Sequence, residues 1–209
     1  MAPPATGTCT LCGHQTTKGA MARHLDACLA RHEPDRGPIQ KWLRLRVEGG
    51  GPYWLDLEAH ANATLSDLDG FLRRTWLECC GHMSAFFVPG RRTEHSMRKT
   101  LLAVFAQRGA EVGYEYDFGS TTALRVRSPG GTYEHRSGPT RVRLLARNVA
   151  PSFTCSECKQ PATMICPFVY GEEEPFFCPE HSEAHRCDDP ECHLPVVNSP
   201  RMGVCAYTG

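Results

Sequence analysis

Residues 39–58 read Ile39-Gln-Lys-Trp-Leu-Arg-Leu-Arg-Val-Glu48, then Gly49-Gly-Gly-Pro52, then Tyr53-Trp-Leu-Asp-Leu-Glu58. In the first part, leucine and valine alternate with arginine, which is typical of a strand with one buried face and one face in water. The glycines and the proline indicate a turn. In the second part, apolar residues again recur at every second position. The sequence therefore predicts two strands joined by a turn at the start of a folded core.

The residues that follow alternate between helical and extended patterns. Thr64 or Ser66 can cap a helix that runs to about Cys80, with Gly81 as its stop. Beyond it we expect a strand at 84–88, a helix at 97–107, and strands at 112–118, 122–127 and 141–146. This order predicts the α+β class, with a β-grasp-like mixed sheet and packed helices.

Length and composition restrict the class of protein further. The chain has 209 residues, with 23 basic and 23 acidic side chains, and is long enough for one ordinary domain with small appendages. It has no apolar run of the roughly 18 residues that a membrane span needs. Residues 1–8 show neither the basic nor the apolar region of a secretory signal. Twelve cysteines in such a chain favour reduced, metal-binding thiols and a cytoplasmic protein.

Charge and turn residues divide the chain into three parts. Residues 1–36 carry a net charge of +1, residues 37–150 of +5 and residues 151–209 of −6. Proline-containing stretches, Glu33–Pro38 and Asn148–Pro151, lie at the two borders. We therefore expect a zinc finger with a linker over 1–36 and an α+β core over 37–150. A zinc-ribbon-like or cross-braced module with a tail follows over 151–209, so that two small zinc-binding modules flank the core.

The first metal motif has the spacing Cys9-x2-Cys12-x11-His24-x3-Cys28. Two cysteines three positions apart present both thiolates from one turn, and residues four apart on a helix share a face. A helix over 20–32 would supply the last two ligands. The pattern predicts a zinc finger of the CCHC type. His32 lies one turn further along the same face and is the alternative fourth ligand.

The C-terminal part contains a complete set of ligands for one zinc ion. Its other cysteines and histidines could bind a second ion. The first site combines two pairs of residues: Cys155 with Cys158, and Cys178 with His181. The second would use His185, Cys187 and Cys192, with Cys166 and Cys205 as further candidates. The alternative for Cys166 is a buried strand cysteine, and for Cys205 it is packing within the tail. The sequence thus predicts two zinc ions and leaves ligands for a third, all in structural rather than catalytic sites.

Four longer strings carry a resemblance to a known family. They are Trp76–Phe86, Tyr116–Thr122, Leu144–Asn148 and Leu194–Cys205. Over residues 37–209 the chain resembles the plasmid Ri ORF-three-like family, and more closely its zinc-containing branch. The resemblance implies an α+β core and an association with mobile elements, without a settled activity.

The same resemblance bears on catalysis. Much of that family continues Tyr-Asp-Phe-Gly with an acidic residue, a tryptophan and a histidine. Here Ser120, Thr122 and Leu124 stand in those places, so we expect no acid/base site of that kind.

Two further features bear on catalysis. Cys79-Cys80-Gly81-His82 places thiols beside a base, but Cys79 falls on the apolar stripe of the expected helix, and adjacent cysteines more often pack as small hydrophobes. Asp117 is expected to brace the turn at Gly119 through its own backbone. We therefore assign no catalytic residue, and an enzyme with a site near His82 and Asp117 remains the less favoured alternative.

Arginines supply the candidate surface for nucleic acid. On 125–127 and on 141–143, two arginines share one strand face, so that neighbouring strands could present a basic stripe to phosphate. The alternative is a solvated face that is balanced by nearby acids. The candidate residues are Arg91, Arg92, Arg125, Arg127, Arg141 and Arg143.

The sequence as a whole favours one function over two others. The leading hypothesis is a non-enzymatic, zinc-stabilised binding protein that associates with nucleic acid and is linked to mobile elements. A protein-recognition adaptor that uses its zinc modules is the alternative. We identify no small-molecule substrate and no membrane partner.

Overall fold

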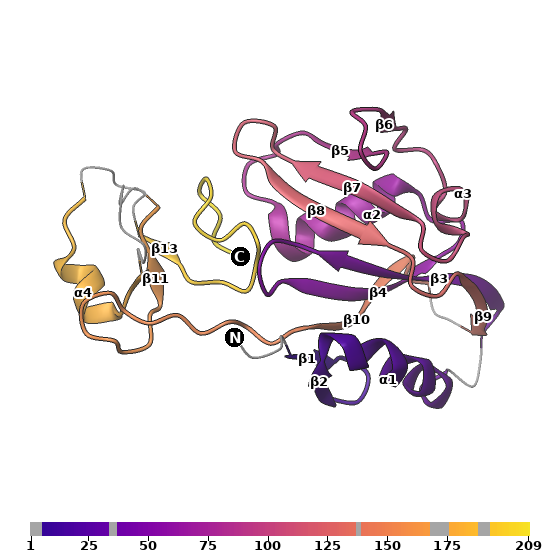
Figure 1. The fold of residues 1–209 in the computed structure, drawn as a ribbon, viewed down its shortest axis with the longest axis horizontal. Helices are drawn as coiled ribbons and strands as arrows, with labels where there is room; N and C mark the ends of the chain where they lie inside the picture. Colours follow the sequence, from indigo (N-terminus) through magenta and orange to yellow (C-terminus); the bar gives the residue numbers. More distant parts are fainter. Residues whose placement is uncertain (1–5, 34–36, 137–138, 168–175, 188–192) are drawn as a thin grey trace.

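The structure is a computed structural model that describes residues 6–33, 37–136, 139–167, 176–187 and 193–209. Ten strands form one antiparallel sheet, and three more form a small sheet at a distance from it (Figure 1). A few short helices pack against the large sheet. The predicted α+β class is confirmed at this level, whereas the β-grasp likeness of the core stays a prediction.

The large sheet follows one path of paired strands, with a tenth strand beside β3. In spatial order the strands are β2 (Gln15–Thr17), β1 (Thr6–Cys9), β10 (Val142–Asn148), β4 (Trp54–His60), β3 (Ile39–Glu48), β8 (Thr122–Arg127), β7 (Glu111–Tyr116), β5 (Ser84–Phe87) and β6 (Glu94–His95), and β9 (Thr132–Arg136) pairs with β3. The predicted pair of strands over 39–58 is therefore confirmed as β3 and β4, in the middle of the sheet. The sequence patterns did not predict β9 or β6.

Apart from the fourteen-residue α1 (Lys18–Arg31), the helices of the described residues are short. The others are α2 (Leu65–Leu72), the wide helical turn η1 (Arg73–Leu77), α3 (Leu101–Phe105) and α4 (Pro179–Ala184). Among the described residues, none of these helices has the length and apolarity needed to cross a membrane. The predicted helix over 97–107 is shortened to α3, because Thr100 caps it and only one turn follows.

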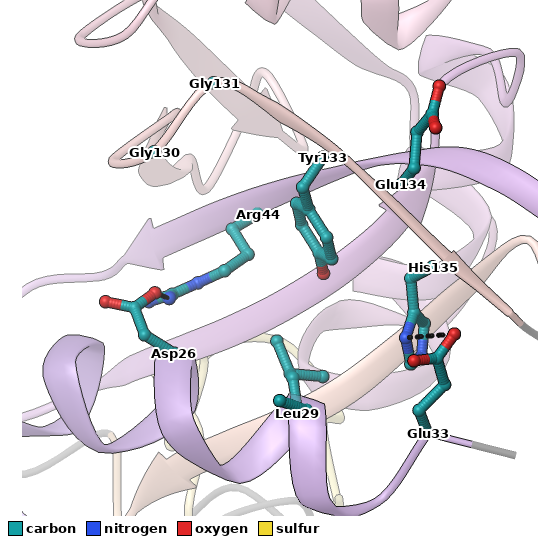
Figure 2. A pocket seen from close by; sticks show the side chains of 10 residues that line it. Asp26, Leu29, Glu33, Arg44, Gly130, Gly131, Tyr133, Glu134 and His135 are labelled. Carbon is teal, nitrogen blue, oxygen red and sulfur yellow. Dashed lines mark hydrogen bonds and ion pairs between the residues drawn. The ribbon is translucent and has the colours of Figure 1, made fainter.

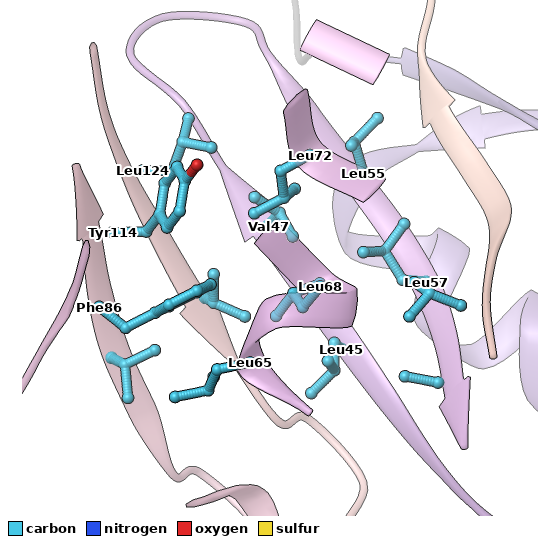
Figure 3. Packing of buried hydrophobic residues seen from close by; sticks show 14 of the residues in the cluster. Leu45, Val47, Leu55, Leu57, Leu65, Leu68, Leu72, Phe86, Tyr114 and Leu124 are labelled. Atoms are coloured by element: carbon cyan, nitrogen blue, oxygen red, sulfur yellow. The ribbon is translucent and has the colours of Figure 1, made fainter. Parts of the chain in front are cut away.

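The main hydrophobic core lies between α2 and one face of the sheet. Figure 3 shows Leu65, Leu68 and Leu72 of α2 facing the side chains of β3 and β4, among them Leu45 and Leu57. All five side chains are fully buried. Burying a leucine is worth about 1.5–3 kcal/mol, so this contact is a main source of stability for the core.

The start of α2 follows the prediction, but its end does not. The Thr64 hydroxyl accepts from the backbone N–H of Asp67, and the Asp67 carboxylate accepts from the backbone N–H of Thr64, which forms a capping box. The predicted continuation to Cys80 is wrong. The backbone N–H of Glu78 donates to the carbonyl of Arg73. From Glu78 onward the chain leaves the helix in an extended conformation. Cys79 therefore lies on a loop rather than on a helical stripe.

The second face of β3 is also buried, which the alternation of leucine and arginine did not predict. Arg44 and Arg46 are less than a tenth exposed, because α1 covers them. Arg46 donates to both carboxylate oxygens of Asp56, at 2.8 and 2.6 Å, and also to the carbonyl oxygen of Lys18. Arg44 is paired with Asp26 of α1. The expectation of a solvent-exposed arginine face is wrong because the N-terminal segment lies on it.

The N-terminal segment is joined to the large sheet. Strand β1 pairs with β10 in antiparallel register, from Gly7 opposite Asn148 to Cys9 opposite Ala146. A Cβ atom at Gly7 would stand 2.3 Å from the ring of Trp54, so only glycine permits this close approach. The finger-like segment therefore extends the sheet of the core.

The C-terminal segment first leaves the core and then returns to it (Figure 1). The small sheet has the order β12 (Phe176–Phe177), β11 (Met164–Ile165), β13 (Leu194–Pro195), and α4 lies beside it. After β13, the tail runs back along the core. There the Ser199 hydroxyl donates to the carbonyl of Trp76 at 2.6 Å.

Candidate metal centres

The first candidate metal centre lies between the β1–β2 hairpin and α1. Its residues, here called the finger cluster, are Cys9, Cys12, His24 and Cys28. Their ligand atoms all lie within 4.8 Å of one another. The sulfurs of Cys9 and Cys28 are 3.8 Å apart, and Cys12 Sγ lies 3.4 Å from His24 Nε2. Zinc–sulfur bonds of about 2.3 Å place two sulfurs of a tetrahedral site about 3.8 Å apart. The four residues thus meet with the dimensions of a metal site.

The local backbone explains how the finger cluster forms. The N–H of Gly13 donates to the carbonyl of Cys9 at 2.9 Å, and Gly13 has a φ of 74°, which closes the turn between the two cysteines. Helix α1 then places His24 and Cys28 one turn apart. The alternative ligand His32 lies outside the cluster, and its Nδ1 donates to the carbonyl of Cys28 at 2.9 Å.

The second candidate centre is the ribbon cluster, at the base of α4. Its residues are Cys155, Cys158, Cys178 and His181, which are the four ligands predicted from their spacing in the sequence. The sulfurs of Cys158 and Cys178 are 3.7 Å apart. His181 Nδ1 lies 3.6 Å from Cys155 Sγ and 3.2 Å from Cys178 Sγ. Pro179 at the first position of α4 fixes the start of the helix that carries His181.

The electrostatics of the ribbon cluster favour the thiolate form at two of its three cysteines. At Cys158 a backbone N–H from Gln160 lowers the pKa, but burial and the thiols of Cys178 and Cys155 raise it overall. Burial by itself would raise the pKa of Cys155, but backbone N–H donors from Cys178, Cys158 and Glu157 lower it to about 6. The pKa of Cys178 is also lowered, first by a backbone N–H from His181. Because the thiolate is the form that binds metal ions, this turn is prepared for a cation.

The third group is incomplete within the described residues. Its residues, here called the partial cluster, are Cys166, His185 and Cys187. The sulfurs of Cys166 and Cys187 are 3.9 Å apart. The expected ligand Cys192 lies outside the described residues. Cys205, a further candidate for this site, is placed elsewhere in the fold.

Cys205 belongs to a fourth group that spacing did not reveal. This tail cluster consists of Cys79, Cys80, His82 and Cys205, again with all ligand atoms within 4.8 Å. Cys80 Sγ lies 2.9 Å from His82 Nε2, 3.4 Å from Cys205 Sγ and 3.5 Å from Cys79 Sγ. Cys205 Sγ lies 3.6 Å from His82 Nε2. The sequence offered Cys80-x-His82 as a signal, but Cys205 was expected at the second C-terminal site instead.

Asp117 and Arg201 form a buried ion pair behind the tail cluster. Arg201 is fully buried and donates to Asp117 Oδ2 at 2.7 Å. This hydrogen bond lowers the pKa of Asp117 to about 2. The other carboxylate oxygen accepts from the N–H of Gly119 at 3.0 Å, so the predicted bracing of the turn is confirmed. His82 Nδ1 lies 3.6 Å from Asp117 Oδ1. The two residues of the alternative catalytic site are therefore close together.

Most arginines predicted to contact nucleic acid have acidic neighbours. The ion pairs are Arg92–Glu115, Arg125–Glu48, Arg127–Glu48, Arg141–Asp67 and Arg143–Glu58. Glu48 and Glu58 are buried beneath the arginines that they accept from. Arg91 is exposed. The basic stripe is therefore compensated locally by carboxylates.

A hollow of about 330 Å³ lies between α1 and β9 (Figure 2). Leu29 enters it from α1, Glu33 from just beyond the end of α1, and Tyr133 and His135 from β9. Glu33 Oε1 lies 3.8 Å from His135 Nδ1. The Tyr133 hydroxyl is already hydrogen-bonded to the buried Glu58. The hollow is thus a seam between the finger-like segment and the sheet.

Comparisons with known proteins assign no family to the chain. No family model matches it, and no curated protein matches it. Among solved structures, it is similar to a protein of unknown function from Methanosarcina mazei Go1, with 19% sequence identity and a TM-score of 0.41. That match covers 55% of this chain and 71% of the other.

Proposed function

We propose that the protein is a non-enzymatic binding protein stabilised by zinc. The observation that carries the proposal is that the finger and ribbon clusters each bring four protein ligand atoms to one point. Four protein ligands fill a tetrahedral zinc site, whereas a catalytic zinc ion keeps one position open for water. The ions would therefore hold the modules in shape rather than activate a substrate.

The finer expectations from sequence belong to the same proposal. They are the β-grasp likeness of the core, membership of the plasmid Ri ORF-three-like family with its link to mobile elements, and a cytoplasmic location. The gathering of cysteines in candidate metal clusters supports a reducing compartment.

The partner that we propose is a protein, which makes the chain an adaptor. The predicted basic stripe is compensated by carboxylates, and this weakens its attraction for phosphate. Two exposed apolar side chains, Met83 and Phe118, offer a different kind of contact. Their backbones lie close together, because the N–H of Asp117, the residue before Phe118, donates to the carbonyl of Met83 at 2.8 Å. Exposed apolar side chains that gather at one place favour protein recognition.

Nucleic acid is the second candidate, on account of a different surface. Arg23 and Arg31 lie on one face of α1, with Ala27 between them, and all three are exposed. Eight residues of helix separate the two guanidinium-bearing positions by about 12 Å. A finger helix that presents two arginines in this way could contact a phosphate backbone.

A salt series with duplex DNA separates the two candidates. For the adaptor, we expect zinc-loaded protein to show no binding of random duplex DNA by fluorescence anisotropy, even at about 50 mM salt. Steep salt-dependent binding would contradict this. In that case, Arg23→Ala with Arg31→Ala should reduce the salt slope by about 2, and the matched pair Arg125→Ala with Arg127→Ala should leave it unchanged.

Variants of the finger cluster test which residue completes it. We expect Cys28→Ser to lose one zinc equivalent per chain, because Cys28 Sγ faces the other three ligands. The matched variant His32→Ala should keep its zinc, since His32 lies outside the cluster. Metal analysis of the purified proteins checks both. If His32→Ala loses the ion and Cys28→Ser retains it, the assignment of the fourth ligand is wrong.

A further inference from the structure

The tail cluster resembles the finger cluster in its dimensions, although no spacing motif connects its members. Cys80 and Cys205 are 125 residues apart in sequence, and their sulfurs are 3.4 Å apart. A disulfide would need about 2.05 Å, so these are separate thiols. Three of its sulfur–sulfur and sulfur–nitrogen distances, 3.4, 3.5 and 3.6 Å, are close to those across the finger cluster, 3.4 and 3.8 Å. Cys80 Sγ and His82 Nε2 lie closer together, at 2.9 Å.

The surroundings of the tail cluster provide the partners that a metal site requires. His82 directs Nε2 at the sulfurs, and its other ring nitrogen lies 3.6 Å from the carboxylate of Asp117. Carboxylates in this position orient the histidine ligands of metal ions. Arg201 donates to Cys79 Sγ at 3.5 Å. Because Arg201 is also paired with Asp117, it offers this sulfur a hydrogen bond rather than a full counter-charge.

The backbone at Cys205 is an independent observation. Cys205 has a φ of 54°, in the left-handed region that side-chain-bearing residues rarely adopt. Although the residue is exposed, its sulfur lies within 4.8 Å of the other three ligand atoms. Such a conformation persists where the surrounding structure holds it, and it is common at binding sites.

We propose that the tail cluster binds one zinc ion that fastens the C-terminal tail to the core. Cys205 would be the only ligand from the tail, and the other three come from the loop between η1 and β5. The soft thiolates and the imidazole suit zinc better than magnesium or calcium. The ion crosslinks two distant points of the chain and thereby holds Arg201 against Asp117. This site goes beyond the proposed function and does not depend on the partner of the protein.

Counting zinc in single and double variants tests the site. Cys80 and Cys205 are both exposed, so Cys80→Ser and Cys205→Ser should fold. We measure zinc by elemental mass spectrometry and expect each full-length single variant to hold one zinc equivalent less than the unaltered protein. The variant that carries both Cys80→Ser and Cys205→Ser should also lose one equivalent, not two. Combining Cys205→Ser with Cys158→Ser, which alters the exposed cysteine of the ribbon cluster, should remove two. The neighbouring substitution Ala206→Ser is the control and should remove none.

A second measurement examines the fastening itself. Hydrogen exchange of residues 198–207 should become faster in Cys205→Ser, and exchange in β3 and β4 should not change. The proposal is overturned if Cys205→Ser keeps the zinc content of the unaltered protein. It is also overturned if the variant that carries both Cys80→Ser and Cys205→Ser loses two ions. Retained zinc together with rapid alkylation of Cys80 would instead indicate a nucleophilic thiol beside His82 and Asp117. None of these outcomes alters the expected zinc content of the finger and ribbon clusters.

Discussion

Loss of zinc from the ribbon cluster is expected to unfold the segment around it while the large sheet stays intact. Cys155→Ser removes one buried ligand. The few buried apolar side chains nearby, such as Ile165 and Phe177, are too small a core to hold the segment without the ion. Structural zinc contributes about 10–16 kcal/mol of binding free energy to small modules of this kind. We therefore expect near-complete loss of hydrogen-exchange protection over 153–166 and 176–187.

The large sheet provides an internal reference for that experiment. Protection in β3 and β4 should stay unchanged, because their core is formed by α2 and not by the C-terminal segment. The matched substitution Glu183→Gln, at an exposed position of α4, should leave zinc and protection unaltered. If residues 176–187 remain protected in Cys155→Ser after metal analysis shows one ion lost, the ribbon cluster is not what holds this segment together.

Local patterns predicted the parts of this structure in which neighbours in sequence are also neighbours in space. The alternation over 39–58 predicted β3 and β4 because strand pairing across a short turn is local. The finger and ribbon clusters were recognised because their ligands come in pairs three or four residues apart, which a turn or one helical turn brings together.

The tail cluster and the burial of Arg44 could not be predicted in this way. Both depend on segments that are remote in sequence. Arginine that alternates with leucine normally indicates a strand face exposed to solvent. Here the packing of α1 against β3 buries Arg44. Likewise, the sequence pattern predicted Cys79 and Cys80 to be in a helix, whereas η1 ends at Leu77. Cys205 joins their cluster because the tail packs back against the core.

The ion pair between Arg201 and Asp117 is a buried charged contact between that tail and the core. Besides Asp117, Arg201 donates to the carbonyl of Ser120 and to the hydroxyl of Thr122, both at 3.1 Å. Its guanidinium also lies 4.8 Å from the centre of the Tyr116 ring. A fully buried guanidinium with these partners cannot be removed singly without leaving a carboxylate unpaired.

Arg201→Met is therefore expected to destabilise the protein by about 3–5 kcal/mol, measured by urea unfolding. Asp117→Asn should cost a similar amount, because it leaves the buried arginine without its counter-ion. The double variant should be less destabilised than the sum of the two, since neither charge is then left alone. Arg201→Lys is the conservative control, and it should recover only part of the loss because lysine lacks the planar fork that reaches Asp117 and Thr122 together. Additive effects in the double variant would contradict a direct pair, and the tail would then be held chiefly by the tail cluster and by Ser199.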